Sequence, residues 1–171
     1  MTQKRLVFLD IDGVLNSMGW KISRSYYSIP GYDPDALQES PPYLLGELDL
    51  TPIALLDELL DDTNAQIVIS SSWRQIHPGI DWLIELFQLR GARLIPARII
   101  GATPVINSIS LLHQRGNEID SYISTHAFDG KFICIDDCSF HYQPYHKVVE
   151  TNPGIGFSVI DYQQALDLLN G

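Results

Sequence analysis

The sequence has 171 residues, of which 45% are hydrophobic and 19% charged, and its formal net charge is −10. This length and composition predict one folded domain and exclude a disordered chain. The acidic balance argues against a strong nucleic-acid-binding patch, which would be basic. The sequence contains neither an apolar run long enough to span a membrane nor a signal peptide, which predicts a cytoplasmic protein and leaves export without such a peptide open.

Short and nearly continuous apolar runs are typical of strands buried on both faces of a parallel sheet. In chain order they predict strands at 6–11, 66–69, 92–95, 131–135 and 147–150. Helical patterns separate these runs. Because strands and helices alternate, the sequence predicts an α/β fold with a largely parallel, doubly wound sheet.

The helices are marked by apolar stripes and by residues suited to their ends. Thr51 and Pro52 predict an N-cap and first turn before the stripe that runs to residue 60. A second stripe covers 80–89, and Gly91 is placed to end it. A shorter helix is predicted at 118–124, and Asp161 is the predicted cap of a last helix that runs to 169.

The stretch 17–49 does not fit this alternation. It is rich in tyrosine and proline, which makes it too irregular for a second domain and too aromatic for a flexible linker. We expect an ordered excursion of the single domain 1–171 that lies over the functional site. Tyrosine rings there would suit stacking on a phenyl ring or a base.

Four carboxylates fall at the ends of two predicted strands. Asp10 and Asp12 end the first strand and are followed at once by Gly13, which permits a sharp turn. Asp136 and Asp137 end the strand at 131–135. Ligands of such sheets bind at the carboxyl ends of the strands, and four acids gathered there need a positive partner. A hard divalent cation such as Mg²⁺, which prefers oxygen ligands, is the simplest one.

The spacing of Asp10 and Asp12 indicates phosphoryl transfer. One carboxylate can attack phosphorus and form an aspartyl-phosphate, while the other protonates the leaving oxygen and later activates water. Ser70 and Ser71 follow the strand at 66–69, where a hydroxyl and backbone N–H groups can hold phosphate oxygens. The alternative for these serines is an ordinary helix cap.

Three motifs together resemble the haloacid dehalogenase (HAD) superfamily of phosphotransferases. They are FLDIDGVLN at 8–16, SSSWR at 70–74 and the acid pair at 136–137, and the resemblance spans roughly 6–157. It is closest to small HAD phosphatase domains. It implies a HAD-like Rossmannoid three-layer α/β/α sandwich with a mainly parallel sheet and a minimal cap.

The resemblance also implies a role for each matching residue. Asp10 would be the nucleophile and Asp12 the general acid/base. Mg²⁺ would be bound by Asp10, Asp136 and the backbone carbonyl of Asp12, with Asp137 assisting. Register favours Ser71 over Ser70 on the substrate phosphate, and Arg115 takes the place of the family's basic residue, which is a lysine in many members.

Other groups receive weaker interpretations. Cys134, Cys138, His141 and His146 match no standard zinc spacing, and Cys134 is better placed as a core residue. Trp73 is expected to pack below the site, and Arg74 to pair with nearby acids.

The sequence predicts a Mg²⁺-dependent phosphomonoester hydrolase, and its substrate stays open. No segment is long enough for a full cap domain, so an exposed substrate such as a phosphotyrosine protein or a nucleic-acid end is favoured. The acidic charge favours a phosphopeptide, whereas a likeness to HAD domains of RNA-repair enzymes favours a nucleic-acid end. A small-molecule phosphatase and a catalytically idle binding module are the alternatives. All four aspartates are present, which argues against the idle module.

Overall fold

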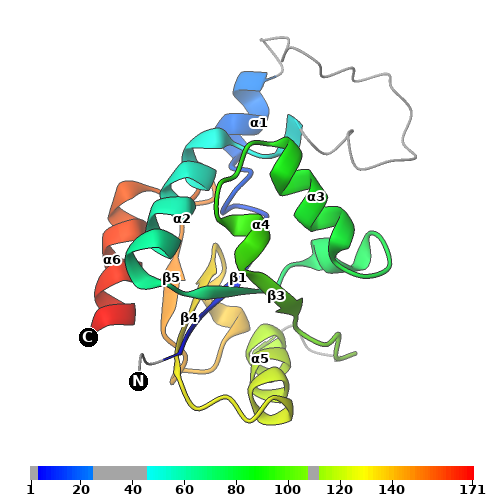
Figure 1. Ribbon diagram of the computed structural model, residues 1–171, viewed down its shortest axis with the longest axis vertical. Helices are drawn as coiled ribbons and strands as arrows, with labels where there is room; N and C mark the ends of the chain where they lie inside the picture. The colour runs from blue at the N-terminus through cyan, green and yellow to red at the C-terminus, as the bar shows by residue number, and fades with distance from the viewer. Residues whose placement is uncertain (1–3, 25–45, 108–111) are drawn as a thin grey trace.

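The computed structural model describes residues 4–24, 46–107 and 112–171. Its centre is one sheet of five strands: β1 (Arg5–Leu9), β2 (Gln66–Ile69), β3 (Ile99–Ala102), β4 (Lys131–Asp136) and β5 (Val148–Glu150). Every pairing is parallel, and the strand order is β3-β2-β1-β4-β5. The strand β1 therefore lies in the middle, with partners on both sides (Figure 1).

The described helices surround this sheet. They are α1 (Met18–Arg24), α2 (Leu50–Thr63), α3 (Asp81–Leu89), α4 (Ile95–Arg98), α5 (Gln114–Thr125) and α6 (Val159–Asn170). Two short 3₁₀ turns, η2 (Ser72–Gln75) and η3 (Ser139–His141), follow β2 and β4. None of the described helices combines the length and apolar character that a membrane span requires.

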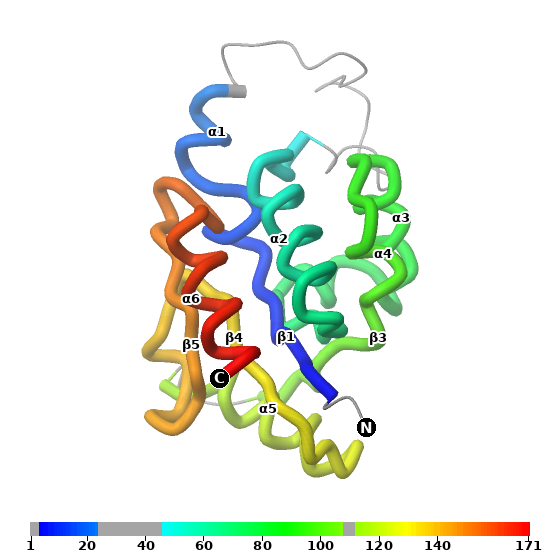
Figure 2. Tube along the Cα trace, turned by 60° about the vertical axis from the view of Figure 1, so that its left-hand side comes forward, coloured from blue at the N-terminus to red at the C-terminus, as the bar shows by residue number. Residues whose placement is uncertain are grey.

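Alternation along β1 builds a core on each face of the sheet. Val7 and Leu9 point into the larger core, which the buried faces of α2, α3 and α6 complete. Leu6 and Phe8 point the opposite way, into a smaller core closed by α5. Figure 2 shows α2 and α6 beside β1, whereas α5 lies at the bottom of the view, apart from these two helices. The predicted three-layer α/β/α fold is confirmed.

The strand predicted at 92–95 is wrong. Residues Ile95–Arg98 form α4, and the strand β3 begins only at Ile99. Pro96 lacks the N–H that a sheet needs, and its fixed φ suits a first helical turn. The buried Asp57 carboxylate of α2 accepts the N–H groups of Arg93, Leu94 and Ile95, which holds this turn in place.

Two predicted helix caps are also shifted. Asp49, not Thr51, caps α2 and accepts the Thr51 N–H at 2.9 Å. Ser158 caps α6, while Asp161 sits at the third helical position and accepts the Ser158 N–H, so the two form a capping box. Gly91, at φ +88°, follows the end of α3 as predicted.

Candidate active site

Strand register places the predicted site residues at one edge of the sheet. Leu9 of β1 pairs with Ile69 on one side and with Ile135 on the other. The next residues along these strands are Asp10, Ser70 and Asp136, which therefore lie at the same level. All three are buried. The site is thus assembled by the three central strands.

Three carboxyl groups converge at this edge. Ligand oxygens of Asp10, Asp136 and Asp137 all lie within 4.8 Å of one another. Asp10 Oδ1 is buried and has no hydrogen-bond partner among the described residues. A buried carboxylate oxygen without a donor, next to two more acids, fits a divalent cation such as Mg²⁺.

Without a bound cation, the ionised forms of these buried acids are unfavourable. Burial raises the pKa of Asp10 to about 6 and that of Asp136 to about 7. Repulsion from Asp10 adds to the shift of Asp136, whereas the charge of Arg115 lowers the pKa of both groups. A divalent cation between the carboxylates would favour their ionised forms and so oppose the effect of burial.

A turn after β4 fixes the orientation of Asp136. Its Oδ1 accepts the Cys138 N–H at 2.8 Å, and its Oδ2 accepts the Tyr142 hydroxyl at 2.6 Å. Burial raises the pKa of Tyr142 well above its usual value, so its hydroxyl remains a donor. Tyr142 was not among the predicted site residues, because nothing in the sequence links it to Asp136.

A Mg²⁺ ion held by these acids would bind more weakly without the Tyr142 hydroxyl. Groups that orient a metal ligand contribute roughly tenfold or more to metal affinity, so we expect Tyr142→Phe to raise the Mg²⁺ dissociation constant about tenfold, as measured by calorimetric titration. Tyr162→Phe is the matched control, because the exposed Tyr162 hydroxyl also donates to a carboxylate, that of Asp62 on α2. Equal affinities in all three proteins would contradict this role.

Gly13 allows Asp137 to approach the first strand. A Cβ at position 13 would lie 2.2 Å from Asp137 Oδ2, and the backbone has φ +70°. The Thr151 hydroxyl after β5 donates to the Gly13 carbonyl at 3.0 Å and holds this turn. A glycine at this position is therefore required both by backbone conformation and by space.

Asp12 lies apart from the three converging acids. Its side chain is 48% exposed. Trp73 Nε1 donates to Asp12 Oδ2 at 3.0 Å, and Asn16 Nδ2 donates to Oδ1 at 2.7 Å. Lys21 Nζ of α1 lies 3.8 Å from the same Oδ1. Trp73 was expected only to pack below the site, and the structure adds this hydrogen bond.

The two candidate serines differ in their contacts. Both are fully buried. The Ser71 hydroxyl accepts the Trp73 N–H at 3.3 Å and lowers the pKa of Asp10, so it lies beside that carboxyl group. Ser70 Oγ has no partner among the described residues. Ser71 thus caps η2, as the helix-cap alternative predicts, and also lies beside Asp10, while its role on a substrate phosphate stays a prediction.

Arg115 lies in the first turn of α5 and faces the acids. Its Nη1 is 3.5 Å from Glu118 Oε2, a carboxylate that is fully buried. Arg74 Nη2 reaches the same Oε2 at 2.7 Å, so the predicted pairing of Arg74 with an acid is confirmed. Arg74 also donates to the carbonyls of Ser71 and Thr103. Glu118 therefore contacts both arginines, and Arg74 connects it to the carbonyls that follow β2 and β3.

Sequence reasoning passed over Glu118, although a signal was present. Arg115 and Glu118 are three residues apart, a spacing that brings an arginine and an acid together on a helix, and α5 begins at Gln114, before the start of the helix predicted at 118–124. The pairing with Arg74, 44 positions away, has no local signal.

The cysteines and histidines weighed as a zinc site lie in different surroundings. Cys134 is buried in the smaller core, on β4. His146 Nε2 contacts Asp120 Oδ1 of α5 at 3.1 Å, and its Nδ1 accepts the Gln143 N–H. Both ring nitrogens of His146 are thus engaged by protein groups.

Part of the excursion 17–49 is described. Residues 18–24 form α1, which Figure 2 shows at the end of the molecule toward which β1 runs. Trp20 Nε1 donates to the Gly46 carbonyl at 2.9 Å and joins the two described ends of this stretch. Residues 25–45, which hold all four of its tyrosines, lie outside the described residues. Of the described part, Lys21 of α1 approaches Asp12, and the position of the whole excursion over the site stays a prediction.

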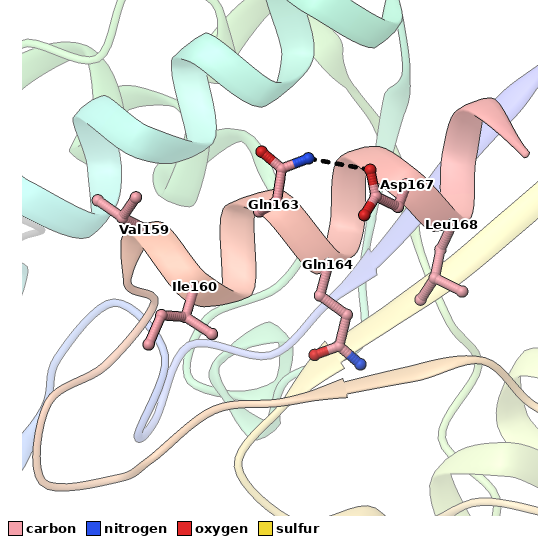
Figure 3. Close-up of a pocket in the computed structure, with 6 residues that line it drawn as sticks. All are labelled: Val159, Ile160, Gln163, Gln164, Asp167 and Leu168. Atoms are coloured by element: carbon pink, nitrogen blue, oxygen red, sulfur yellow. Dashed lines mark hydrogen bonds between the residues drawn. The ribbon is translucent and has the colours of Figure 1, made fainter.

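A hollow of about 620 Å³ lies along α6 and contains none of the candidate site residues. Figure 3 shows its lining, which consists of three apolar side chains, two amides and one carboxylate: Val159, Ile160, Leu168, Gln163, Gln164 and Asp167. It offers one carboxylate, and that accepts a hydrogen bond from Gln163 at 2.9 Å. The candidate active site is therefore located by its chemistry, at the strand ends.

The chain is similar to known proteins. Residues 6–161 match the family described as the HAD domain in Swiss Army Knife RNA repair proteins. A solved structure from Streptococcus pneumoniae, titled a hydrolase of the haloacid dehalogenase-like family, aligns at a TM-score of 0.46 with 16% identity, over 96% of this chain and 92% of that chain. The sequence matches no curated protein. The family match spans nearly the whole chain, and the chain belongs to that family of HAD domains and so to the haloacid dehalogenase superfamily.

Proposed function

We propose that this protein is a Mg²⁺-dependent phosphomonoester hydrolase that acts through an aspartyl-phosphate. The observation that carries the proposal is the convergence of Asp10, Asp136 and Asp137, with the unpartnered Asp10 Oδ1 at its centre. Ser71 and Arg115 lie near Asp10 and would supply the hydroxyl and the cation that the reaction needs, and Asp12, two residues after Asp10, would supply the acid. A catalytically idle binding module would not require this complete set of catalytic side chains.

Asp10, Asp136, Asp137 and the backbone carbonyl of Asp12 would hold Mg²⁺. When bound, the ion neutralises charge on the phosphoryl group and on the acids. Arg115 adds a fixed positive charge, and Ser71 adds a hydroxyl donor to a phosphate oxygen. Much of the stabilisation of the transition state should come from these groups, because phosphoryl transfer depends chiefly on position and charge.

The reaction has two in-line steps. In the first, an Asp10 carboxylate oxygen bonds to phosphorus, the bond from phosphorus to the ester oxygen breaks, and the proton of Asp12 passes to that leaving oxygen. In the second, Asp12 takes a proton from water as the water oxygen bonds to phosphorus. The bond to Asp10 breaks, inorganic phosphate leaves, and both aspartates regain their starting states.

The proposed substrate is the phosphorylated end of an RNA strand. Membership of a family of domains from RNA repair proteins supports this class. Lys21 and Arg115 provide positive charge beside Asp12 and Asp10, where a strand end would enter. The overall acidic charge does not oppose this substrate, because an end needs few contacts compared with a bound duplex.

Phosphate release from a substrate panel tests the proposal. The panel holds oligoribonucleotides with a 3′- or a 5′-phosphate, a phosphotyrosine peptide and p-nitrophenyl phosphate, each with Mg²⁺ or with EDTA. We expect Mg²⁺-dependent release from all reactive substrates and the highest kcat/KM on one RNA end. A preference for the peptide would overturn the RNA assignment alone, whereas no release from any substrate would overturn the phosphatase assignment.

A further inference from the structure

We infer that Trp73 is a positioning residue that holds the general acid/base Asp12 relative to the phosphate site. The inference rests on the proposed function. Its basis is the hydrogen bond from Trp73 Nε1 to Asp12 Oδ2 at 3.0 Å, between a side chain that is almost fully buried and one that is about half exposed. Trp73, the buried partner, is held in place by packing. Asp12, the exposed partner, must reach the oxygen of the leaving group.

Packing determines where the indole N–H points. Trp73 stacks on Trp82, with ring centroids 6.4 Å apart and planes inclined by 15°, and both rings belong to the larger core. The backbone N–H of Trp73 donates to Ser71 Oγ. The ring cannot turn without opening this core, so the donor is preorganised before substrate arrives.

Two donors together orient the Asp12 carboxyl group. Trp73 donates to Oδ2 and Asn16 Nδ2 donates to Oδ1, so each oxygen has a partner and rotation about the Cβ–Cγ bond is opposed. Each oxygen keeps a second lone pair, which can carry the proton that passes to the leaving oxygen. The two donors therefore fix the orientation of the Asp12 carboxyl group, and they do not occupy the lone pair that proton transfer requires.

The same turn carries the phosphate ligand and the residue that holds the acid. Ser71 and Trp73 are two positions apart at the start of η2, directly after β2. A shift of this turn would move the hydroxyl and the indole together. Trp73 thus sets the distance between phosphorus and the proton of Asp12, which a purely structural tryptophan would not do.

Dependence on the leaving group tests this role. An alkyl phosphate needs a proton on its leaving oxygen, whereas 2,4-dinitrophenyl phosphate releases a stable anion that does not. We expect Trp73→Phe, which keeps an aromatic ring and removes the N–H, to lower kcat/KM about tenfold on the alkyl phosphate and about twofold or less on the activated ester.

Trp82→Phe is the matched control. It changes the other ring of the same stacked pair, and Trp82 Nε1 is buried without a hydrogen-bond partner among the described residues. We expect this variant to have equal effects on the two substrates, and thermal melts and Mg²⁺ titrations of both variants measure any general loss of folding. A selective loss in Trp82→Phe as large as that in Trp73→Phe would overturn the inference.

Failure of the inference is distinct from failure of the proposed function. If the wild-type protein hydrolyses both esters and Trp73→Phe lowers both rates equally or neither, Trp73 does not position Asp12. If the wild-type protein hydrolyses neither ester in the presence of Mg²⁺, the phosphatase assignment itself is overturned, and with it the role of Trp73.

Discussion

Replacement of Asp10 by asparagine should reduce phosphate release by at least about 10⁴-fold, because the amide cannot supply the attacking oxygen. The fold should survive, since Asp10 Oδ1 makes no hydrogen bond among the described residues and the amide has nearly the same shape. The rate is measured with Mg²⁺ on the best RNA-end substrate and on p-nitrophenyl phosphate at equal protein concentrations.

Asp62→Asn is a suitable control for this experiment. Asp62 is an exposed carboxylate near the end of α2, bonded to the Tyr162 hydroxyl. We expect it to keep wild-type turnover. If Asp10→Asn retained a rate within tenfold of the wild type on both substrates, Asp10 would not be the nucleophile.

Replacement of Glu118 by alanine should cost about 3–5 kcal/mol in the free energy of unfolding, because it leaves the buried Arg74 without its counter-ion. The same change frees Arg115 from its contact at 3.5 Å and should lower turnover as well. Urea denaturation of the metal-free protein measures the stability loss, and kcat together with kcat/KM on the phosphorylated substrate measures the effect of displacing Arg115.

The exposed pair of Glu58 and Arg93 provides the control. Its N–O distance is 2.7 Å, equal to that between Arg74 and Glu118, but both of its side chains are more than half exposed. Glu58→Ala should therefore cost about 1 kcal/mol or less. Similar losses in the two variants would show that burial of the Glu118 pair adds nothing. Glu118→Gln should fall between wild type and Glu118→Ala, since an amide oxygen can still accept from arginine.

The sequence was informative where one local pattern decides a structure. Continuous apolar runs locate β1, β2 and β4, because their residues are buried on both faces of the sheet. The run at 92–95 has the same composition but forms the approach to α4, since its N–H groups are held by Asp57 from another helix. Contacts of this kind join residues far apart in the sequence, so no local sequence pattern predicts them.

The same division applies to the active site. The aspartates were predictable because strand ends in a parallel sheet share one edge, and the register confirms that Asp10 and Asp136 meet there. Tyr142, Trp73 and Glu118 act through bonds to residues on other elements or across turns. Their side chains are of types that usually fill cores or surfaces, so only the folded structure identifies their contacts.

The central place of β1 has a consequence for how the protein is made. During synthesis β1 and Asp10 leave the ribosome before β4, the strand that ends at Asp136, so one side of β1 has no partner until β4 has also emerged. Until then the nascent chain carries only part of the acid cluster. The acid cluster can therefore form only after β4 has left the exit tunnel and can pair with β1.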